Sequence, residues 1–465
     1  MKSLLSVVVV SVALALPGCA TFEPESVEPP LPLPEQWHLG GTDTTPAMDT
    51  RWWQAFGDPV LISLVEQALE HNPDLAATAE AVIQADLQLR NAGASLLPEV
   101  GGSGSTGKQI SRRDGTTSNA GSTRLGLDIS YEVDLWGRLR ASEASATATL
   151  AATRYDLSGA RLTLVASVAS TWFQLLDARE RLQVAERNLD IARRTLTLVA
   201  ARHRLGAADR SELARQRTEV LSRENAIPPL QYQVQAREAA LQVLTGRMPY
   251  QQALPEAGLM AVSVPAIASG LPAEVIRQRP DIAAVEARLQ AASADVAVAR
   301  AALLPSLSLS GAVTLTNASL LSLADPVTGA NGLLSLAQTL FDGGRRENAV
   351  ALSRSRQVAL LAQYRSALLT AVQEVGDAQE RVALYRGQEL RLEGIHEQAE
   401  EALRLTEVRY REGADDLLTL LSAQESVFSV RSQLSQARLE RLQAAVDLYK
   451  ALGRWPEAPE AIAGG

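Results

Sequence analysis

The chain from residue 124 to residue 135 alternates strictly between apolar and polar side chains. The apolar positions are Leu125, Leu127, Ile129, Tyr131, Val133 and Leu135. A period of two places these side chains on one face of a β-strand and the polar ones on the other. We expect four strands, at about 99–110, 123–135, 306–316 and 332–341. A length near ten residues is typical of tilted transmembrane strands, although a soluble β-hairpin packed on helices would alternate in the same way.

Four long stretches outside the strands have the apolar period of a helix. We expect helices at 138–203, 209–245, 345–410 and 416–452. In the first of them one apolar line repeats every seven residues: Val168, Leu175, Leu182, Leu189 and Leu196. Such spacing forms the seam of a supercoiled helix pair. A single chain with helices this long has too little volume to bury its seams, so we expect further copies to cover them.

Glycine and proline residues recur at a fixed spacing of 207 positions. The pairs are Pro73 and Pro280, Pro98 and Pro305, Gly137 and Gly344, Gly206 and Gly413, Gly246 and Gly453, and Pro249 and Pro456. Because these residues mark turns and helix ends, the two halves have the same element boundaries. A period this long indicates a duplicated domain rather than a solenoid. We expect a first repeat at 51–250, a second at 270–456 and a C-terminal tail at 457–465.

The N-terminal segment has the order of a bacterial export signal. Lys2 precedes an apolar run that ends at Leu16, and Cys19, the single cysteine, follows Gly18. This order resembles the bacterial lipobox, in which the cysteine is acylated and becomes the mature N-terminus. We expect a lipoprotein signal peptide at 1–18, then acylated Cys19 and a Pro-rich tether at 19–50. An ordinary signal peptide with a chance cysteine is the alternative.

Composition excludes several classes of function. The formal charge of −9 argues against nucleic acid as a partner, because phosphate binding needs a basic face. One cysteine rules out a disulfide framework, and four histidines leave little for a metal site. His396-Glu397 opens like a zinc-protease motif, but the second histidine is missing. We find no catalytic, cofactor-binding or metal-binding constellation and expect no enzyme.

Several motifs together resemble one family. They are RWWQAFGDP at 51–59, NPDL at 72–75, YEVDLWGR at 131–138, RQRPDI at 277–282, LFDGGR at 340–345 and ALGRW at 451–455. With the lipobox they resemble the TolC/OprM-type outer membrane factor family, and most closely its NodT-like RND efflux outer membrane lipoproteins. The resemblance implies an α+β membrane protein with a duplicated subunit. In the implied homotrimer, twelve strands close a transmembrane β-barrel and twelve helices continue it as a periplasmic α-barrel.

The resemblance also implies a function. It is that of a passive, gated exit duct in the outer membrane, serving a tripartite efflux pump for drugs or other small molecules. The implied partners are a periplasmic adaptor, an inner-membrane RND transporter and outer membrane lipid. No cofactor is implied apart from the N-acyl and S-diacylglycerol groups on Cys19. A type I secretion duct is the alternative in the same class, and a lipid-anchored coiled-coil scaffold without a pore is the alternative in another.

In the family, the helix tips close the duct, and the returning helix of the second repeat lines the aperture. Leu418 matches the apolar constriction, and Ser422 stands where an acid is usual. Asp415 and Asp416 are then expected to supply the negative ring, although Asp416 as a helix cap and Leu418 as a seam residue are the simpler interpretation. The tip residues expected to meet the adaptor are Arg204, Gly206, Arg411 and Gly413. If the helices splay to open the duct, contacts between tips hold the closed form, with Arg204 and Arg411 the available partners for Asp209 and Asp415.

Two adjacent prolines, Pro228 and Pro229, lie in the middle of the helix expected at 209–245. Ser435 and Gln436 occupy the matching positions of the second repeat. Proline removes a backbone donor and clashes with the preceding turn. We therefore expect a bend or break near Ile227 that has no counterpart in the second repeat.

Overall fold

The computed structural model describes residues 34, 37, 51–251, 254–267, 272–319, 321–453 and 455. The expected signal peptide, the expected lipidation site Cys19 and the C-terminal tail lie outside the described residues. The chain divides into two units. The first contains Ala81–Arg154 and Ala284–Arg365, and the second contains Leu31–Glu80, Tyr155–Ala283 and Ser366–Gly465.

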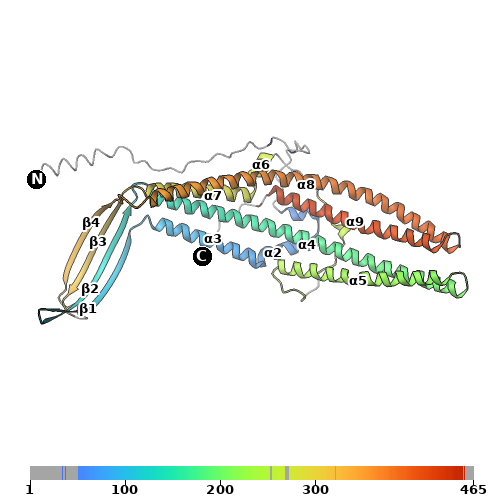
Figure 1. The fold of residues 1–465 in the computed structure, drawn as a ribbon, viewed down its shortest axis with the longest axis horizontal. Coiled ribbons are helices and arrows are strands. Elements are labelled where there is room, and N and C mark those ends of the chain that lie inside the picture. Colours follow the sequence, from blue (N-terminus) through green and yellow to red (C-terminus); the bar gives the residue numbers. More distant parts are fainter. Residues whose placement is uncertain are drawn as a thin grey trace. The chain divides into compact units, whose positions relative to one another are not determined.

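The first unit holds one antiparallel sheet, in which the strands follow one another in chain order (Figure 1). They are β1 (Glu99–Arg113), β2 (Thr116–Val133), β3 (Ser306–Asn317) and β4 (Val327–Ala337). β1 and β4 are the two edges. The apolar row of β2 is open to the surroundings, since Leu125, Leu127 and Ile129 are 45%, 63% and 43% exposed. The row continues onto β3, where Leu315 and Val313 lie opposite Leu125 and Leu127. An exposed apolar face of this extent marks a surface that meets lipid or protein.

The first hairpin is longer than the sequence predicts. β1 runs three residues beyond the expected end at 110, and β2 begins seven residues before the expected start at 123. The strands meet at Asp114 and Gly115, whose φ angles of 50° and 79° form a two-residue turn. Asp-Gly favours this conformation because both residues tolerate positive φ. The extra length escaped the sequence argument because its Gly, Ser and Thr residues do not alternate in polarity.

The described residues form eight α-helices and two short 3-10 helices. They are η1 (Trp52–Phe56), α2 (Pro59–His71), α3 (Pro73–Ala94), α4 (Arg138–Arg204), α5 (Arg210–Leu244), η2 (Leu259–Ala261), α6 (Pro272–Gln278), α7 (Pro280–Ala301), α8 (Arg345–Arg411) and α9 (Leu417–Leu452). No helix among them is long and apolar enough to cross a bilayer. The starts of α3 and α7, and those of α4 and α8, are 207 positions apart.

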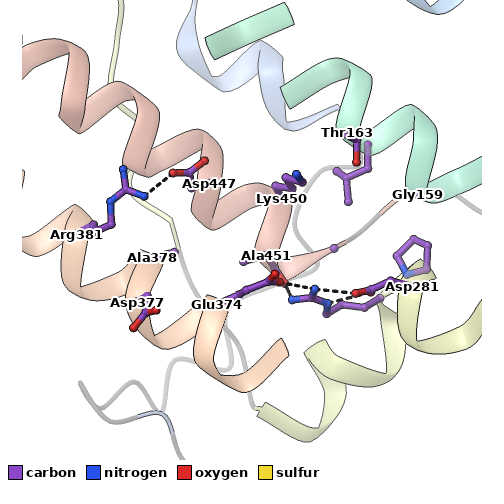
Figure 2. A pocket seen from close by; sticks show the side chains of 14 residues that line it. Gly159, Thr163, Asp281, Glu374, Asp377, Ala378, Arg381, Asp447, Lys450 and Ala451 are labelled. Carbon is purple, nitrogen blue, oxygen red and sulfur yellow. Dashed lines mark hydrogen bonds and ion pairs between the residues drawn. The ribbon is translucent and has the colours of Figure 1, made fainter. Parts of the chain in front are cut away.

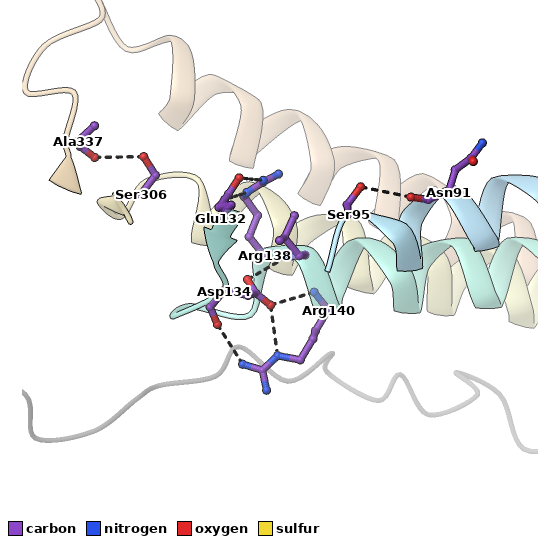
Figure 3. A network of polar contacts seen from close by, with 9 residues as sticks. Asn91, Ser95, Glu132, Asp134, Arg138, Arg140, Ser306 and Ala337 are labelled. Atoms are coloured by element: carbon purple, nitrogen blue, oxygen red, sulfur yellow. Dashed lines mark hydrogen bonds and ion pairs between the residues drawn. The ribbon is translucent and has the colours of Figure 1, made fainter. Parts of the chain in front are cut away.

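Acidic side chains set the starts of α4 and α8. The carboxylate of Asp134 accepts hydrogen bonds from the backbone N–H groups of Leu139 and Arg140 at 3.0 and 3.1 Å, and it pairs with the Arg140 side chain (Figure 3). Asp342 accepts bonds from the first backbone N–H groups of α8 in the same way. Negative charge at a helix N-terminus satisfies donors that have no partner within the helix. The long helices therefore start soon after the strands end, following residues 134–137 in the first repeat and 338–344 in the second.

The heptad seam is buried where helices of the second unit pack together. Leu189 and Ala192 of α4 pack with Val220 of α5, and Leu196 and Ile227 lie against them. Other apolar side chains of the long helices stay about half exposed. On α8 these are Leu369, Leu384, Leu390, Ile395, Leu405 and Val408. One chain therefore buries only part of the apolar surface that its helices carry.

The helix α5 is not broken at its two prolines. It is helical from Arg210 through Pro228 and Pro229 to Leu244. A break near Ile227 is therefore excluded, while a bend stays a prediction. Each proline removes one helical hydrogen bond, but Val220 and Ile227 pack against α4 before the prolines, and Glu238 pairs with Arg179 of α4 after them. Tertiary contacts here outweigh the local preference of the residues.

In each repeat, a side-chain hydrogen bond of the same geometry holds the C-terminal end of the second long helix, which is α5 in the first repeat and α9 in the second. In the first, the Asn72 side-chain amide donates to the Leu244 carbonyl at 3.0 Å. In the second, the Arg279 guanidinium donates to the Ala451 carbonyl at 2.9 Å. We call these contacts the first and the second latch. Their residues are 207 positions apart, so the duplication extends to single hydrogen bonds.

The second latch carries charges that the first lacks. Arg279 is 7% exposed at its side chain and pairs with Asp281 at 2.8 Å and Glu374 at 2.6 Å (Figure 2). Burial by itself raises the pKa of Asp281, but hydrogen bonds and charge from Arg279 outweigh burial and hold that pKa below its usual range. The latch borders a cavity of about 430 Å³, where Arg381 pairs with Asp447 at 2.7 Å. This region is held mainly by ion pairs.

Candidate functional site

Each long helix hairpin turns at a glycine in the left-handed conformation. Gly206 has a φ angle of 72° and Gly413 one of 78°. The Ala207 N–H donates to the Arg202 carbonyl, and the Ala414 N–H donates to the Arg409 carbonyl, both at 2.8 Å. This bond across a left-handed glycine is the Schellman motif, which satisfies carbonyls that the helix end leaves free. The two tips therefore have the same backbone.

Asp415 gives the second tip an ion pair that the first tip cannot form. Its carboxylate accepts two hydrogen bonds from the Arg409 guanidinium, both at 2.9 Å, whereas Ala208 holds the matching position of the first tip. The expected pairing with Arg411 is wrong. The Schellman bond folds residue 414 back onto residue 409, so the next carboxylate lies beside Arg409. The hydrogen bonds from Arg409 keep the pKa of Asp415 below its usual range.

Asp416 caps the helix α9. It accepts hydrogen bonds from the backbone N–H and the hydroxyl of Thr419 at 2.8 and 2.7 Å. The backbone bond, with the hydroxyl bond, keeps the pKa of Asp416 below its usual range. Both Asp415 and Asp416 are thus anionic at neutral pH, although Asp416 also performs the ordinary work of an N-cap.

Asp209 caps α5 in the same manner, since it accepts a hydrogen bond from the Glu212 N–H at 2.8 Å. Within the described residues Asp209 forms no ion pair with Arg204, and the expected contact between tips stays a prediction. Arg204 and Arg411 are exposed, and neither forms an ion pair within the part of the chain that the structure describes.

Leu418 is 59% exposed, while its neighbours Leu417 and Leu420 are 3% and 4% exposed. Those two leucines pack with Val199 of α4 and Tyr410 of α8 in one apolar cluster beneath the tips. Leu418 lies outside this cluster. The chain therefore presents one large apolar side chain in the first turn of α9 that none of its own helices covers.

Ser422 is exposed one helical turn after Leu418, on the same side of α9. It lines a cavity of about 390 Å³ with Glu219, Arg223 and Glu425. Arg223 of α5 pairs with Glu219 at 2.6 Å and also with Glu425 of α9. Sequence reasoning missed this cluster because its members come from different helices, and spacing along one helix cannot reveal the pairing.

A buried carboxyl joins α4 to α9 farther from the tips. The Ser435 hydroxyl donates to Asp177 at 2.7 Å, and the two residues are 2% and 5% exposed. Burial raises the pKa of Asp177 above its usual range, and the nearby Glu180 and Glu440 carboxylates raise it further. The hydrogen bond from Ser435 and the charge of Arg181 lower this pKa but do not outweigh burial. Leu384 and Pro228 hold the matching positions of the other repeat, so this contact occurs once per chain.

Comparisons with known proteins agree with this architecture. The chain is 39% identical over 464 residues, 95% of each chain, to the pyoverdine export outer membrane protein OpmQ of Pseudomonas putida. It is 31% identical to the outer membrane protein OprJ of Pseudomonas aeruginosa, across 96% of this chain and 95% of that one. The open-state MtrE outer membrane channel of Neisseria gonorrhoeae superposes with a TM-score of 0.84 at 28% identity, covering 94% of this chain and 98% of that one.

The family described as outer membrane efflux protein matches the chain twice, at residues 64–247 and 271–454. The two matches are offset by the same 207 positions as the glycines, prolines and latches. It is a family of outer membrane channel proteins and not of enzymes. The resemblance inferred from the motifs is thereby confirmed, and this chain belongs to the outer membrane efflux protein family.

Proposed function

We propose that this chain forms, as a homotrimer, the outer membrane exit duct of a tripartite RND-type efflux pump. The observation that carries the proposal is the four-stranded sheet with an exposed apolar row and two free edges. In a bilayer, a free edge leaves backbone groups without partners, so a spanning sheet must close on itself. Four strands are too few to close a barrel. Three copies supply twelve, and β1 of one copy then pairs with β4 of the next.

The helices support the same assembly. The apolar residues of α8 that stay about half exposed in one chain are available to bury against a neighbouring copy. Such burial removes about 25 cal/mol of free energy per Å² of apolar surface taken from water. In this assembly the long helices line a tunnel through the periplasm, and the tips form its inner end.

The tips are where we place both the gate and the adaptor. Three copies of Leu418 around one axis form an apolar constriction, which hydrated ions cross poorly. Asp415 and Asp416 add a negative field at the mouth that favours cations. Ser422 lies one helical turn farther along the same side of α9. The Glu219 and Glu425 carboxylates that line its cavity supply the negative charge that an acid at position 422 would carry. The adaptor-contact residues are Arg204, Gly206, Arg411 and Gly413.

We further propose that the mature chain is anchored by lipid on Cys19. The motif at residues 16–19 and the absence of Asp at position 20 support an outer membrane lipoprotein. Mass spectrometry of the mature N-terminus should find acylated Cys19, and an unmodified N-terminus elsewhere would contradict it. Cys19→Ser should mislocalise the tether while trimers still form, because the closed barrel itself holds the protein in the membrane.

The relatives named for pyoverdine export make a secreted small molecule of that kind the first cargo to test. Deletion of this gene should retain such a compound in the cell, and complementation should restore it to the medium. An excess of retained polypeptide instead would favour the type I secretion alternative.

A paired substitution tests the duct itself. Leu127→Arg places a charge on the apolar row, and Ser130→Arg places the same charge on the opposite face of β2. At mid-bilayer, a lipid-facing arginine costs about 2–4 kcal/mol, so Leu127→Arg should abolish the heat-modifiable, sarkosyl-insoluble trimer in outer membranes. Ser130→Arg should leave the trimer intact. Equal behaviour of the two variants, or a wild type without such trimers, would favour the scaffold without a pore.

A further inference from the structure

The first β-hairpin extends beyond the rest of the sheet. β2 pairs with β3 only from Thr123 onward, and residues 116–122 pair with β1 alone. We call residues 107–122 the hairpin extension. Its β1 half is exposed as far as its side chains are described. It is therefore a two-stranded ribbon that continues beyond the ends of β3 and β4.

The strand register fixes which side chains of the extension face the same way as the apolar row. Gly104 lies opposite Leu125, Lys108 lies opposite Gly121, and Arg112 lies opposite Thr117. Directly opposed residues share a face, and every second residue along a strand returns to it. Lys108 and Arg112 thus lie on the face of Leu125 and not on the opposite, polar face.

The distance along the strand places these cations beyond the apolar row. From Val133 to Leu125 the row spans about 27 Å of strand at roughly 3.4 Å per residue. With a tilt near 40°, the row covers about 21 Å of depth, most of the apolar band of about 25 Å in outer membrane barrels. Lys108 lies four residues beyond the Leu125 position, about 13 Å farther along the strand. That is the level of lipid headgroups.

Of the two hairpins, only the first carries positive charge. The second hairpin, Ser306 to Ala337, contains no lysine or arginine. Within the described residues, neither Lys108 nor Arg112 forms an ion pair. Two exposed cations, about 13 Å apart on one face and continuous with an apolar row, complement a lipid surface that bears phosphate.

We propose that Lys108 and Arg112 bind phosphate groups of the anionic lipid in the outer leaflet of the outer membrane. The inference rests on the proposed orientation of the sheet, with the row of Leu125 and Leu127 toward lipid. A guanidinium and an ammonium both form charge-assisted hydrogen bonds with phosphate oxygens. The contact fixes the height of the barrel in the membrane and adds to the hydrophobic match of the strands.

The scarcity of lysine allows a direct test on the unaltered full-length protein. Lysine occurs at positions 2, 108 and 450 only, and position 2 belongs to the expected signal peptide. The protein is reconstituted in lipopolysaccharide vesicles or in net-neutral phosphatidylcholine vesicles, and amine acylation is followed by mass spectrometry. Acylation of Lys108 should be several-fold slower in lipopolysaccharide, while Lys450 reacts equally in both. Inorganic phosphate added in detergent should not protect Lys108; protection there would identify free phosphate as the ligand instead.

Substitutions of the two cations provide a second test of the proposal. Lys108→Ala with Arg112→Ala should lose the rise in trimer dissociation temperature that lipopolysaccharide gives to the wild type. Arg124→Ala, which removes a charge from the opposite face of β2, should keep that rise. Equal Lys108 acylation in the two lipids, or equal loss in both variants, would overturn the inference and leave the proposed duct standing. If Leu127→Arg also assembles normally, the orientation of the sheet itself fails.

Discussion

The two latches perform the same task with different chemistry. In the first, the neutral amide of Asn72 donates to the Leu244 carbonyl and its oxygen also caps α3 through the Leu75 N–H at 2.9 Å. In the second, the Arg279 guanidinium replaces the amide and gathers Asp281 and Glu374 around it. The backbone geometry was kept after duplication while the side chains diverged. The two repeats should therefore respond differently to charge, pH and substitution.

We expect the largest effect on stability from alanine substitutions at the glycine two residues after each latch carbonyl, Gly246 in the first repeat and Gly453 in the second. A Cβ on Gly246 would lie 2.2 Å from the His71 carbonyl oxygen, whereas one on Gly453 would lie 2.5 Å from the Arg279 Cγ. The His71 backbone cannot move without its helix, whereas the Arg279 side chain can shift only by giving up contacts of the second latch, with its Cα 3.1 Å from the added atom. Both residues have positive φ, so Gly246→Ala should cost on the order of 3 kcal/mol of unfolding free energy, and Gly453→Ala somewhat less. Thermal unfolding followed by circular dichroism compares the two, and an equal loss would contradict the difference.

Converting the second latch into the first tests the role of its charge. Arg279→Asn removes a buried cation, and we expect a loss of about 2 kcal/mol, since both carboxylate partners are half exposed and regain water. Asn72→Ala removes the cap of α3 together with the neutral latch bond and should lose about 1 kcal/mol. If Asn72→Ala is the more damaging change, the charged latch contributes less than its contacts indicate.

The same variant has a pH signature. Because the folded pKa of Asp281 lies below its unfolded value of about 4, its contribution is complete above that value and is lost as pH falls through the folded pKa. Wild-type protein should therefore lose stability below about pH 4 more steeply than Arg279→Asn. Parallel curves for the two proteins would assign acid sensitivity elsewhere.

The tips offer a comparison that affects transport and not stability. Leu418→Ala with Asp415→Ala removes the two side chains that distinguish the second tip, where Ser211 and Ala208 hold the matching positions of the first. In a planar bilayer we expect higher single-channel conductance and weaker cation selectivity, with no change in thermal unfolding. Ser211→Ala is the matched control and should alter neither. Unchanged conductance in the double variant would move the constriction to Ser422.

Local signals in the sequence predicted much of the fold. Gly206 and Gly413 marked the tips because a left-handed residue ends a helix, and Asp416 marked the start of α9 because it caps it. The strand face of Leu125 and Leu127 followed from alternation alone. These features depend on residues that are near one another in the chain.

Contacts between distant residues could not be read in this way. The Arg223 pairing with Glu425 and the Ser435 bond to Asp177 join helices more than 200 residues apart in sequence. The partner of Asp415 was also misjudged, because the choice between Arg409 and Arg411 depends on how the tip folds back. At Pro228, packing against α4 decided the outcome that the local rule left open.

The buried carboxyl of Asp177 makes the stability of the helical unit depend on pH. Burial raises its pKa in the folded chain, so its contribution is greatest at low pH and declines as pH rises through the folded value. Asp281 has the opposite sign. Folding therefore takes up protons at one aspartate and releases them at the other, and a trimer carries three such opposed pairs. Acidification of the surroundings would relieve the cost of burying the Asp177 carboxylate while it loosens the second latch, so the two aspartates act in opposite directions on the pH dependence of stability.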